Sequence, residues 1–286
     1  MSAFPRVLVA GATGYLGQHL VHQLLSSGYP AIALARSPGK LSPLGLDESQ
    51  LRVGEVTSPD SILGCCDQVD VVISCVGITR QKDGLGYMDV DYQANLNLLR
   101  EAERAGVRQF IYVSAFNALK FQNVRLLQAK ERFAKRLLSS EIEHPCVVRP
   151  NGFFSDMSDF FEMAKGGRVY LFGNGQHTLN PIHGEDLARF CIDAIGSEER
   201  ELDVGGPELF THRQIGELAF AAMSKQSQIS CFPDGLRKGA ASLCGWLPER
   251  WTGAAEFFLT LMGSDMAAPC YGQHHLEDHF RRLVER

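Results

Sequence analysis

The sequence lacks a C-x-x-C pair, although it contains eight cysteines, at positions 65, 66, 75, 146, 191, 231, 244 and 270. Pairs with that spacing are typical of zinc sites and of dithiol redox centres. Cys65 and Cys66 are adjacent, and a disulfide between neighbours is strained. We therefore expect free thiols in a reducing compartment rather than a disulfide framework or a redox pair.

The sequence also lacks a recognisable targeting or membrane-spanning segment. No charged stretch followed by an apolar run and a small-residue cleavage site precedes the first strand-like run. The apolar stretch at residues 254–262 is interrupted by Glu256 and is too short to cross a bilayer. The expectation is a cytoplasmic protein without an integral membrane segment.

A large excess of charge of either sign is missing as well. The chain has 28 basic and 33 acidic residues, which gives a formal net charge of -5. Binding to nucleic-acid phosphates needs a basic surface, so we do not expect a nucleic-acid partner. The 286 residues are 45% hydrophobic, which is enough to bury a sizeable core.

Short β-branched runs alternate with helical patterns over the first 150 residues. Strands are predicted at residues 7–10, 31–34, 51–53, 69–74, 110–113 and 146–149, and helices at residues 15–27, 91–105 and 124–140. Continuous apolar strands separated by helices are typical of a parallel sheet covered on both faces. The pattern predicts an α/β fold with a doubly wound parallel Rossmann sheet.

The alternation stops after Pro150, where glycine pairs and short runs follow. We predict an NADP-binding Rossmann core at residues 1–150. Residues 151–286 then supply the remaining sheet edge and a small, mostly helical C-terminal substrate lobe, and the two parts form one compact unit. A helix is expected to begin at Thr211, whose hydroxyl can cap it.

A glycine-rich loop connects the first strand to the first helix. Gly11 permits a tight turn, Gly14 lets the backbone approach a pyrophosphate, and Gly17 lets the helix pack close to the sheet. The amide groups that begin the helix can bind phosphate. A plain glycine turn is the alternative, but the strand before the loop and the helix after it favour a dinucleotide site. Its predicted residues are Gly11, Thr13, Gly14, Tyr15, Leu16 and Gly17.

The end of the second strand indicates which dinucleotide binds. An acidic residue there would bind the ribose of NAD, whereas a cation accommodates the 2′-phosphate of NADP. Arg36 and Ser37 stand at this position, Lys40 follows, and the nearest acid is Asp47. Arg36 can pair with phosphate and Ser37 can donate a hydrogen bond, so we predict NADP(H). A solvated loop arginine is the alternative.

At this point roughly residues 6–220 resemble the short-chain dehydrogenase/reductase superfamily, in its atypical extended branch of NmrA-like and divinyl-reductase-like proteins. The resemblance rests on short motifs in a specific order. They are Gly11 to Gly17, Ser74-Cys75-Val76-Gly77, Val90-Asp91-Tyr92, Tyr112-Val113-Ser114-Ala115, Arg149-Pro150 with Gly152-Phe153-Phe154, and Asn180-Pro181-Ile182-His183 with Asp186-Leu187-Ala188.

The resemblance implies further cofactor-binding residues. Val56 would lie near the adenine, and Cys75, Val76 and Gly77 would line the ribose. The segment from Pro150 to Phe154 would lie near the nicotinamide, with Pro150 and Phe153 as its predicted cofactor residues, and Val113 is a further predicted cofactor-binding residue.

One departure from the family pattern concerns the catalytic groups. The usual set is Ser, Tyr and Lys, with the Tyr four residues before the Lys, but Leu126 precedes Lys130 here. Lys130 could hold the nicotinamide ribose and assist proton transfer, and Ser114 ends a strand where ligands bind in this fold. We therefore take Lys130 and Ser114 as the candidate catalytic residues. The alternatives are an ordinary solvated helix face for Lys130 and a strand-end hydroxyl for Ser114.

Other candidate groups have plainer interpretations. Tyr87 and Tyr92 are candidate acids, although packing is expected for Tyr92, and a capping role is expected for His183. His274, His275 and His279 do not form a convincing ligand set, so no metal is predicted.

The function predicted from these residues is the NADPH-dependent reduction of a small apolar acceptor, which could be a carbonyl, a quinone or a conjugated alkene. The alternative is a non-catalytic NADPH-binding redox sensor or assembly subunit. Several aromatic residues are expected in the core. They could otherwise line an apolar substrate pocket, or contact a membrane surface, a partner or a second copy of the chain. They are Phe153, Phe154, Phe160, Phe161, Trp246, Phe257 and Phe258.

Overall fold

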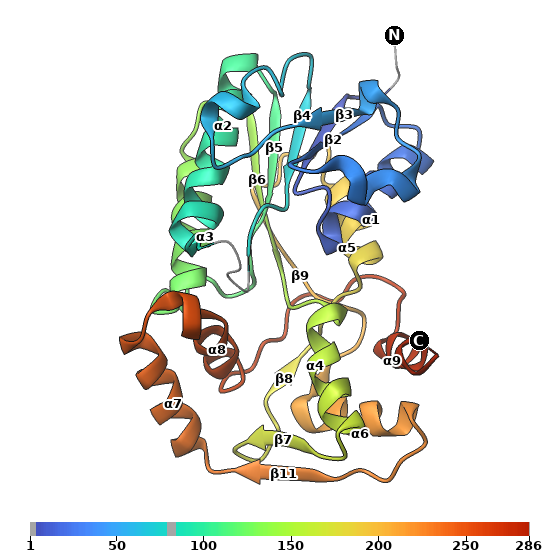
Figure 1. Cartoon of the computed structure of the whole chain (residues 1–286), viewed down its shortest axis with the longest axis vertical. Helices are drawn as coiled ribbons and strands as arrows, with labels where there is room; N and C mark the ends of the chain where they lie inside the picture. The colour runs from blue at the N-terminus through green and yellow to red at the C-terminus, as the bar shows by residue number, and fades with distance from the viewer. Residues whose placement is uncertain (1–3, 79–83, 286) are drawn as a thin grey trace.

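A seven-stranded parallel sheet forms the upper half of the molecule in the computed structural model, which describes residues 4–78 and 84–285 (Figure 1). The strand order is β3-β2-β1-β4-β5-β6-β9, with every neighbouring pair parallel. The predicted doubly wound Rossmann fold is therefore confirmed. The strands are β1 (Val7–Ala10), β2 (Ala31–Ala35), β3 (Leu51–Val53), β4 (Val71–Ser74), β5 (Gln109–Val113), β6 (His144–Pro150) and β9 (Glu201–Val204).

Two helical layers cover the two faces of this sheet (Figure 1). On one face, α1 (Tyr15–Ser26) packs against α5 (Gly184–Asp193). On the other lie α2 (Asn95–Ala105) and α3 (Arg125–Leu138). Because side chains alternate across a strand, each central strand contributes to both apolar cores, as Val9 and Leu8 of β1 do. Covering both faces explains why β1, β2, β4 and β5 are buried at every position.

The helix expected at residues 91–105 has a different beginning. Its first part is a π-helical segment, η4 (Met88–Ala94), and regular α-helix starts only at Asn95. Segments of this kind are rare and are frequently found at functional sites. The wider turn carries Asp91 into the interior, where its side chain is fully buried. The short helical turns η1 (Pro38–Leu44), η2 (Glu48–Gln50) and η3 (Pro59–Ile62) complete this half.

A smaller lobe lies beneath the sheet in Figure 1 and carries the C-terminal helices. The lobe has its own apolar core, which includes Phe154, Phe161 and Phe280. Thr211 caps α6 as expected, because its hydroxyl accepts a hydrogen bond from the amide of Gln214. The elements are α4 (Phe154–Lys165), β7 (Val169–Phe172), β8 (Thr178–Leu179), β10 (Phe210–Thr211), α6 (His212–Ala222), β11 (Ile229–Phe232), α7 (Asp234–Trp246), α8 (Glu249–Leu261) and α9 (Leu276–Val284). The division of function at residue 150 stays a prediction.

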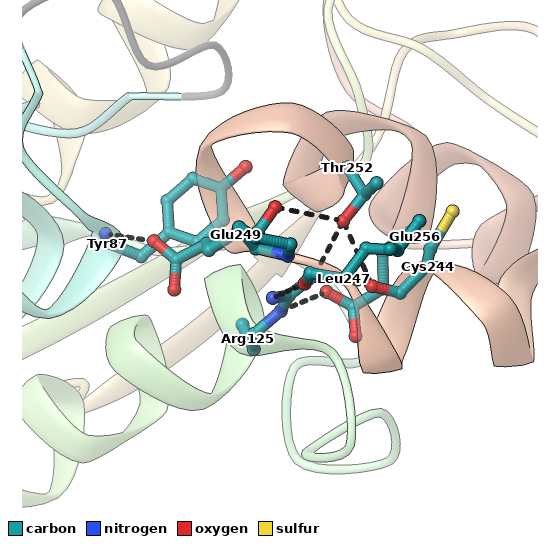
Figure 2. A network of polar contacts seen from close by, with 8 residues as sticks. Tyr87, Arg125, Cys244, Leu247, Glu249, Thr252 and Glu256 are labelled. Atoms are coloured by element: carbon teal, nitrogen blue, oxygen red, sulfur yellow. Dashed lines mark hydrogen bonds and ion pairs between the residues drawn. The ribbon is translucent and has the colours of Figure 1, made fainter.

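Arg125 at the start of α3 ties the lobe to the Rossmann half (Figure 2). Its guanidinium donates to the carboxylate of Glu256 at 2.8 Å and to the backbone carbonyls of Leu247 and Cys244, each at 3.0 Å. The Glu249 carboxylate accepts a hydrogen bond of 2.7 Å from the amide of Tyr87. These contacts join α7 and α8 to residues more than 100 positions earlier, which fixes both helices against the core.

Among residues 4–78 and 84–285, no helix is long and apolar enough to cross a membrane. The cytoplasmic location stays a prediction, and the first three residues, on which it partly rested, lie outside the described part of the chain.

Candidate dinucleotide-binding site

The glycine loop adopts the close packing that its sequence predicts. Gly11 has a φ of +81°, which L residues rarely adopt, and a Cβ there would lie 3.1 Å from the carbonyl of Cys75. A Cβ on Gly17 would lie 2.2 Å from the Gly11 oxygen. Only glycine therefore lets α1 begin this close to β1, and the amides at the start of α1 face the end of the strand.

A groove of about 300 Å³ runs along the carboxyl ends of β1, β2 and β4. This edge of a doubly wound sheet is where nucleotides bind. The groove brings together eight of the predicted cofactor residues, namely Gly11, Thr13, Gly14, Arg36, Val56, Cys75, Val76 and Gly77.

Other predicted residues lie beside this groove rather than in its wall. Leu16 is buried in the core, Val113 is buried at the end of β5, and Ser37 is exposed next to Arg36. The Tyr15 hydroxyl accepts a hydrogen bond of 3.0 Å from the amide of Gly184, so it joins α1 to α5. The Phe153 ring packs edge-on against the Tyr15 ring, with 5.9 Å between centroids.

Arg36 stands at the rim of the groove, with 59% of its side chain exposed. Its guanidinium lies 3.4 Å from the carboxylate of Glu55, which also lines the groove. An exposed ion pair of this length contributes little stability. Because more than half of its side chain is exposed, the guanidinium can reach a more highly charged anion, such as a ribose phosphate.

Most of the Lys130 side chain is shielded from solvent, so an ordinary solvated position is the wrong interpretation for this residue. Its ammonium lies 3.0 Å from the Oδ1 atom of Asp91, and the two side chains are 14% and 0% exposed. Burial by itself would lower the pKa of Lys130, but the oxygens of Tyr112 and Asp91 outweigh it and raise the pKa. Burial raises the pKa of Asp91, and Lys130 partly offsets that rise. Arg132 and Lys135 on the same helix are exposed, as expected.

Two buried hydroxyl groups lie at the end of β5 without a hydrogen-bond partner among the described residues. They belong to Tyr112 and Ser114. The Lys130 ammonium is 5.7 Å from the centroid of the Tyr112 ring, and burial raises the pKa of this tyrosine so that it stays neutral. Buried polar groups without a hydrogen bond are uncommon, so these two hydroxyls are candidates to contact a ligand. The two hydroxyls do not line the groove or the larger cavity, whereas the glycine loop lines the groove and fits a pyrophosphate.

Asp91 and Asn95 are the polar residues whose roles sequence reasoning missed. The Asn95 side chain donates to the backbone oxygens of Val76 and Asp91 and interacts with the Ser74 hydroxyl at 2.6 Å. These contacts shape the loop that follows β4. The two residues are four apart and share a helix face, so a search for polar residues on the buried face of the predicted helix could have found them.

A second, larger cavity of about 760 Å³ continues from the same sheet edge. Ala115 follows β5 and Pro150 ends β6, and both line it. Its walls are mostly apolar and come from α4, β7 and α8, with Phe160, Phe257 and Phe258 among them. The groove thus covers the ends of β1, β2 and β4, and the apolar cavity covers the ends of the next two strands.

The remaining candidate acids have structural partners. Tyr87 is buried beside Leu126, and the guanidinium of Arg132 stacks over the Tyr92 ring at 4.7 Å. The capping role expected for His183 is confirmed, since its Nδ1 atom accepts a hydrogen bond from the amide of Glu185.

The structure brings His183, Glu185 and His274 together, with one possible ligand atom of each within 4.8 Å of the others. The cap already uses the lone pair on Nδ1 of His183, and the Nδ1 atom of His274 lies 2.9 Å from Asp186. His275 instead pairs with Glu208, and the absence of a metal stays a prediction. The Sγ atoms of Cys65 and Cys66 are 3.8 Å apart and both residues are free cysteines.

The sheet order, the glycine loop at its switch point and the groove beside it define a Rossmann protein of the dinucleotide-binding class. The chain belongs to the NAD(P)H-binding family, whose pattern matches residues 11–198. This result confirms the resemblance to NmrA-like members of the extended short-chain dehydrogenase/reductase superfamily, and it makes NAD(P)H the cofactor of the groove.

Several relatives cover nearly the whole chain, among them the following two. The chain is 30% identical to the chloroplastic divinyl chlorophyllide a 8-vinyl-reductase of Zea mays, over 97% of this chain and 79% of that protein. It is 23% identical to the photosystem II assembly factor Ycf39 of Synechocystis, over 98% of this chain and 92% of that protein. Among solved structures, the NADPH complex of an NADPH-dependent quinone oxidoreductase from Escherichia coli matches with a TM-score of 0.70, covering 97% of this chain and 99% of that one at 17% identity.

Proposed function

We propose that the protein is an NADPH-dependent reductase of a small apolar acceptor. The observation that carries this proposal is the apolar cavity of about 760 Å³ at the ends of β5 and β6, directly beside the strands whose ends line the dinucleotide groove. A largely apolar concave site with few polar groups is typical of small-molecule binding.

The groove residues would hold the cofactor as follows. The amides from Gly11 to Gly17 bind the pyrophosphate, and Arg36 with Ser37 binds the 2′-phosphate that distinguishes NADPH from NADH. Val56 contacts the adenine, and residues 75–77 contact the ribose. At the other end, Ser114 and Lys130 bind the second ribose, while Val113, Pro150 and Phe153 position the nicotinamide.

Bound NADPH supplies a hydride, and the two-electron reduction of an acceptor also consumes one proton. The chain offers no tyrosine four residues before Lys130, because Leu126 fills this position and is buried in an apolar cluster. Lys130 itself is held as a cation by Asp91, and its raised pKa makes the ammonium a poor proton donor. Its role is to place a fixed positive charge next to the cofactor.

These features favour an acceptor that needs little acid assistance. A quinone or an activated alkene fits better than a simple ketone, because the charge that develops on reduction is delocalised and water can deliver the proton. The relative from Zea mays is named an 8-vinyl-reductase, which supports an alkene as one possible acceptor class.

The test is the oxidation of NADPH by purified protein with a panel of short-chain quinones, conjugated vinyl compounds and simple ketones, followed at the absorbance of reduced nicotinamide. We expect steady turnover with quinones or activated alkenes, and a fall of at least tenfold in Ser114→Ala and Lys130→Ala. Arg132→Ala is the matched control, since Arg132 is exposed on the same helix.

A non-catalytic role as an NADPH sensor or assembly subunit is the second candidate. Two observations favour it, namely the missing tyrosine and the similarity to an assembly factor. Tight NADPH binding with no turnover of any acceptor in the panel would support this role and would contradict the reductase.

A further inference from the structure

Helices α7 and α8 form a hairpin whose outer surface is unusually apolar. Trp246 ends α7 and is 88% exposed, and Trp251 lies in the first turn of α8 and is 69% exposed. Leu236 and Leu243, seven residues apart on α7, are 59% and 61% exposed, and Leu247 lies between the helices. Soluble proteins rarely expose apolar side chains in such a cluster unless the surface binds something.

The most buried residues of this hairpin include charged ones, although Phe257 and Leu261 of α8 also pack against the apolar core. The buried residues of α7 are Arg237 and Cys244, and those of α8 are Gly253 and Glu256. Arg237 donates to the carbonyl of Leu259 at 2.8 Å, and Glu256 pairs with Arg125. Charged groups thus hold the hairpin together from inside while tryptophans face outward. This arrangement is unfavourable in water and is favourable against a nonaqueous phase.

The exposed face cannot turn inward without breaking strong contacts. In Figure 2, Arg125 of α3 reaches the carbonyls at the tip of the hairpin as well as Glu256 and Thr252. The Glu249 carboxylate is held by the amide of Tyr87. The hairpin is therefore a rigid platform that presents its tryptophans.

The basic groups of the hairpin and its support, which are Arg125, Arg237, Lys238 and Arg250, exceed the acidic groups Asp234, Glu249 and Glu256 by one. Lys238 and Arg250 are exposed, and the guanidinium of Arg250 stacks over the Trp251 ring at 4.8 Å. The carboxylates of the hairpin are engaged, since Asp234 pairs with Arg237 and Lys238, and Glu256 with Arg125. Exposed tryptophan and leucine flanked by lysine and arginine are the features of a surface that lies in the interface of an anionic bilayer.

The same hairpin borders the apolar cavity. Ala255 is one turn beyond Trp251 on α8, and it is both exposed and part of the cavity wall. Tyr170 is likewise exposed and lines the cavity, and it stacks on the exposed Phe232 with 5.8 Å between centroids. The mouth of the cavity therefore opens beside the apolar face, while Asp159 and Glu162 of α4 add exposed carboxylates elsewhere on the rim.

We propose that the hairpin of α7 and α8 docks the protein on an anionic membrane surface, with Trp246, Leu247, Trp251 and Leu243 inserted among the lipid headgroups. Docking in this orientation turns the mouth of the cavity toward the bilayer. This inference about the substrate rests on the reductase function proposed above. The acceptor then belongs to the class of small apolar molecules dissolved in the membrane.

Tryptophan fluorescence tests the docking directly, because Trp246 and Trp251 are the only tryptophans of the protein. Vesicles of phosphatidylcholine mixed with phosphatidylglycerol should shift the emission to shorter wavelength, and brominated lipids should quench it. Vesicles of pure phosphatidylcholine should bind more weakly. An unchanged emission spectrum with the anionic vesicles would overturn the proposal.

Cosedimentation with the same vesicles measures how much the tryptophans and the basic residues each contribute to membrane binding. Trp246→Ser with Trp251→Ser should weaken binding roughly 100-fold, because two large apolar side chains lose their insertion. Lys238→Gln with Arg250→Gln should weaken it about 30-fold on anionic vesicles. The control is Leu63→Ser with Leu209→Ser, which removes two exposed leucines outside the hairpin and should leave binding unchanged.

Two other outcomes count against a lipid surface. In one outcome, the protein forms a dimer without vesicles, and its tryptophan emission is at short wavelength until dilution separates the dimer. A second copy of the chain then covers the apolar face of the hairpin. If the tryptophan variants sediment with vesicles as well as the parent, another surface binds. Docking is measured without NADPH or acceptor, so a failure of the reductase assay leaves this result standing, and a failure of docking leaves the turnover of water-soluble acceptors unaffected.

Discussion

The ammonium of Lys130 lies 3.0 Å from Oδ1 of Asp91, and both groups pack against the backbone of Gly77. Asp91 also accepts a hydrogen bond of 3.3 Å from the amide of Ile78. The ion pair therefore supports the loop after β4, which is one wall of the dinucleotide groove. It couples the stability of the Rossmann core to the shape of the cofactor site.

Lys130→Met should destabilise the fold by about 3 to 5 kcal/mol, because it leaves the fully buried Asp91 carboxylate without its partner. Urea unfolding measures this change. Adding Asp91→Asn to Lys130→Met should restore much of the lost stability, since no unpaired charge remains. Equal destabilisation in the single and double variants would contradict a buried ion pair.

Gly77→Ala should weaken NADPH binding at least tenfold and lower the stability by roughly 1 to 3 kcal/mol. A Cβ at this position would lie 2.6 Å from Oδ1 of Asp91 and 2.9 Å from Nζ of Lys130, so the loop must shift. Titration with NADPH and urea unfolding measure the two effects. Gly39→Ala is the matched control, because a Cβ there meets no atom within 4 Å. Parent-like binding in Gly77→Ala would show that the loop does not shape the site.

Arg36→Ala should raise the dissociation constant for NADPH roughly 10- to 100-fold, as expected for the loss of a hydrogen bond to a charged group worth about 1.5 to 3 kcal/mol. The dissociation constant for NADH should change little, because NADH has no 2′-phosphate. Fluorescence titration with both cofactors gives the two constants. Equal weakening of both would mean that Arg36 does not recognise this phosphate.

The stability of the protein should fall as the pH decreases from about 6.5 to about 4. Burial is the main reason that the pKa values of His183 and His212 are lowered to about 4, with His274 adding to the effect at His183 and His177 at His212. In this window the unfolded chain binds protons that the folded chain does not, so unfolding is favoured as the pH decreases.

Each of these two histidines should contribute at most about 3 kcal/mol to that loss, which is complete near pH 4. Urea unfolding between pH 7.5 and 4.5 measures it. In His212→Gln, the free energy of unfolding should depend less steeply on pH, because about one proton fewer is taken up on unfolding. A slope identical to that of the parent would contradict a neutral buried His212.

The sequence by itself determined the parts of the molecule that depend on local patterns. Apolar runs and the helices between them specify the parallel sheet, because each strand must be buried on both faces. The loop from Gly11 to Gly17 predicts its own geometry, since the turn, the amides and the start of α1 lie within seven residues. Caps such as Thr211 and His183 also depend only on neighbours in the chain.

Only the tertiary structure decided the environment of each side chain that contacts distant segments. The charges around Lys130 on α3 left a solvated helix face as the alternative, but Asp91 lies 39 positions earlier and contacts Lys130 from a π-helical turn. The apolar cavity joins α4 to α8, and Trp246 and Trp251 are exposed while Arg237 and Glu256 of the same helices are buried. Such arrangements depend on which segments of the chain contact one another, and local sequence patterns do not predict contacts between distant segments.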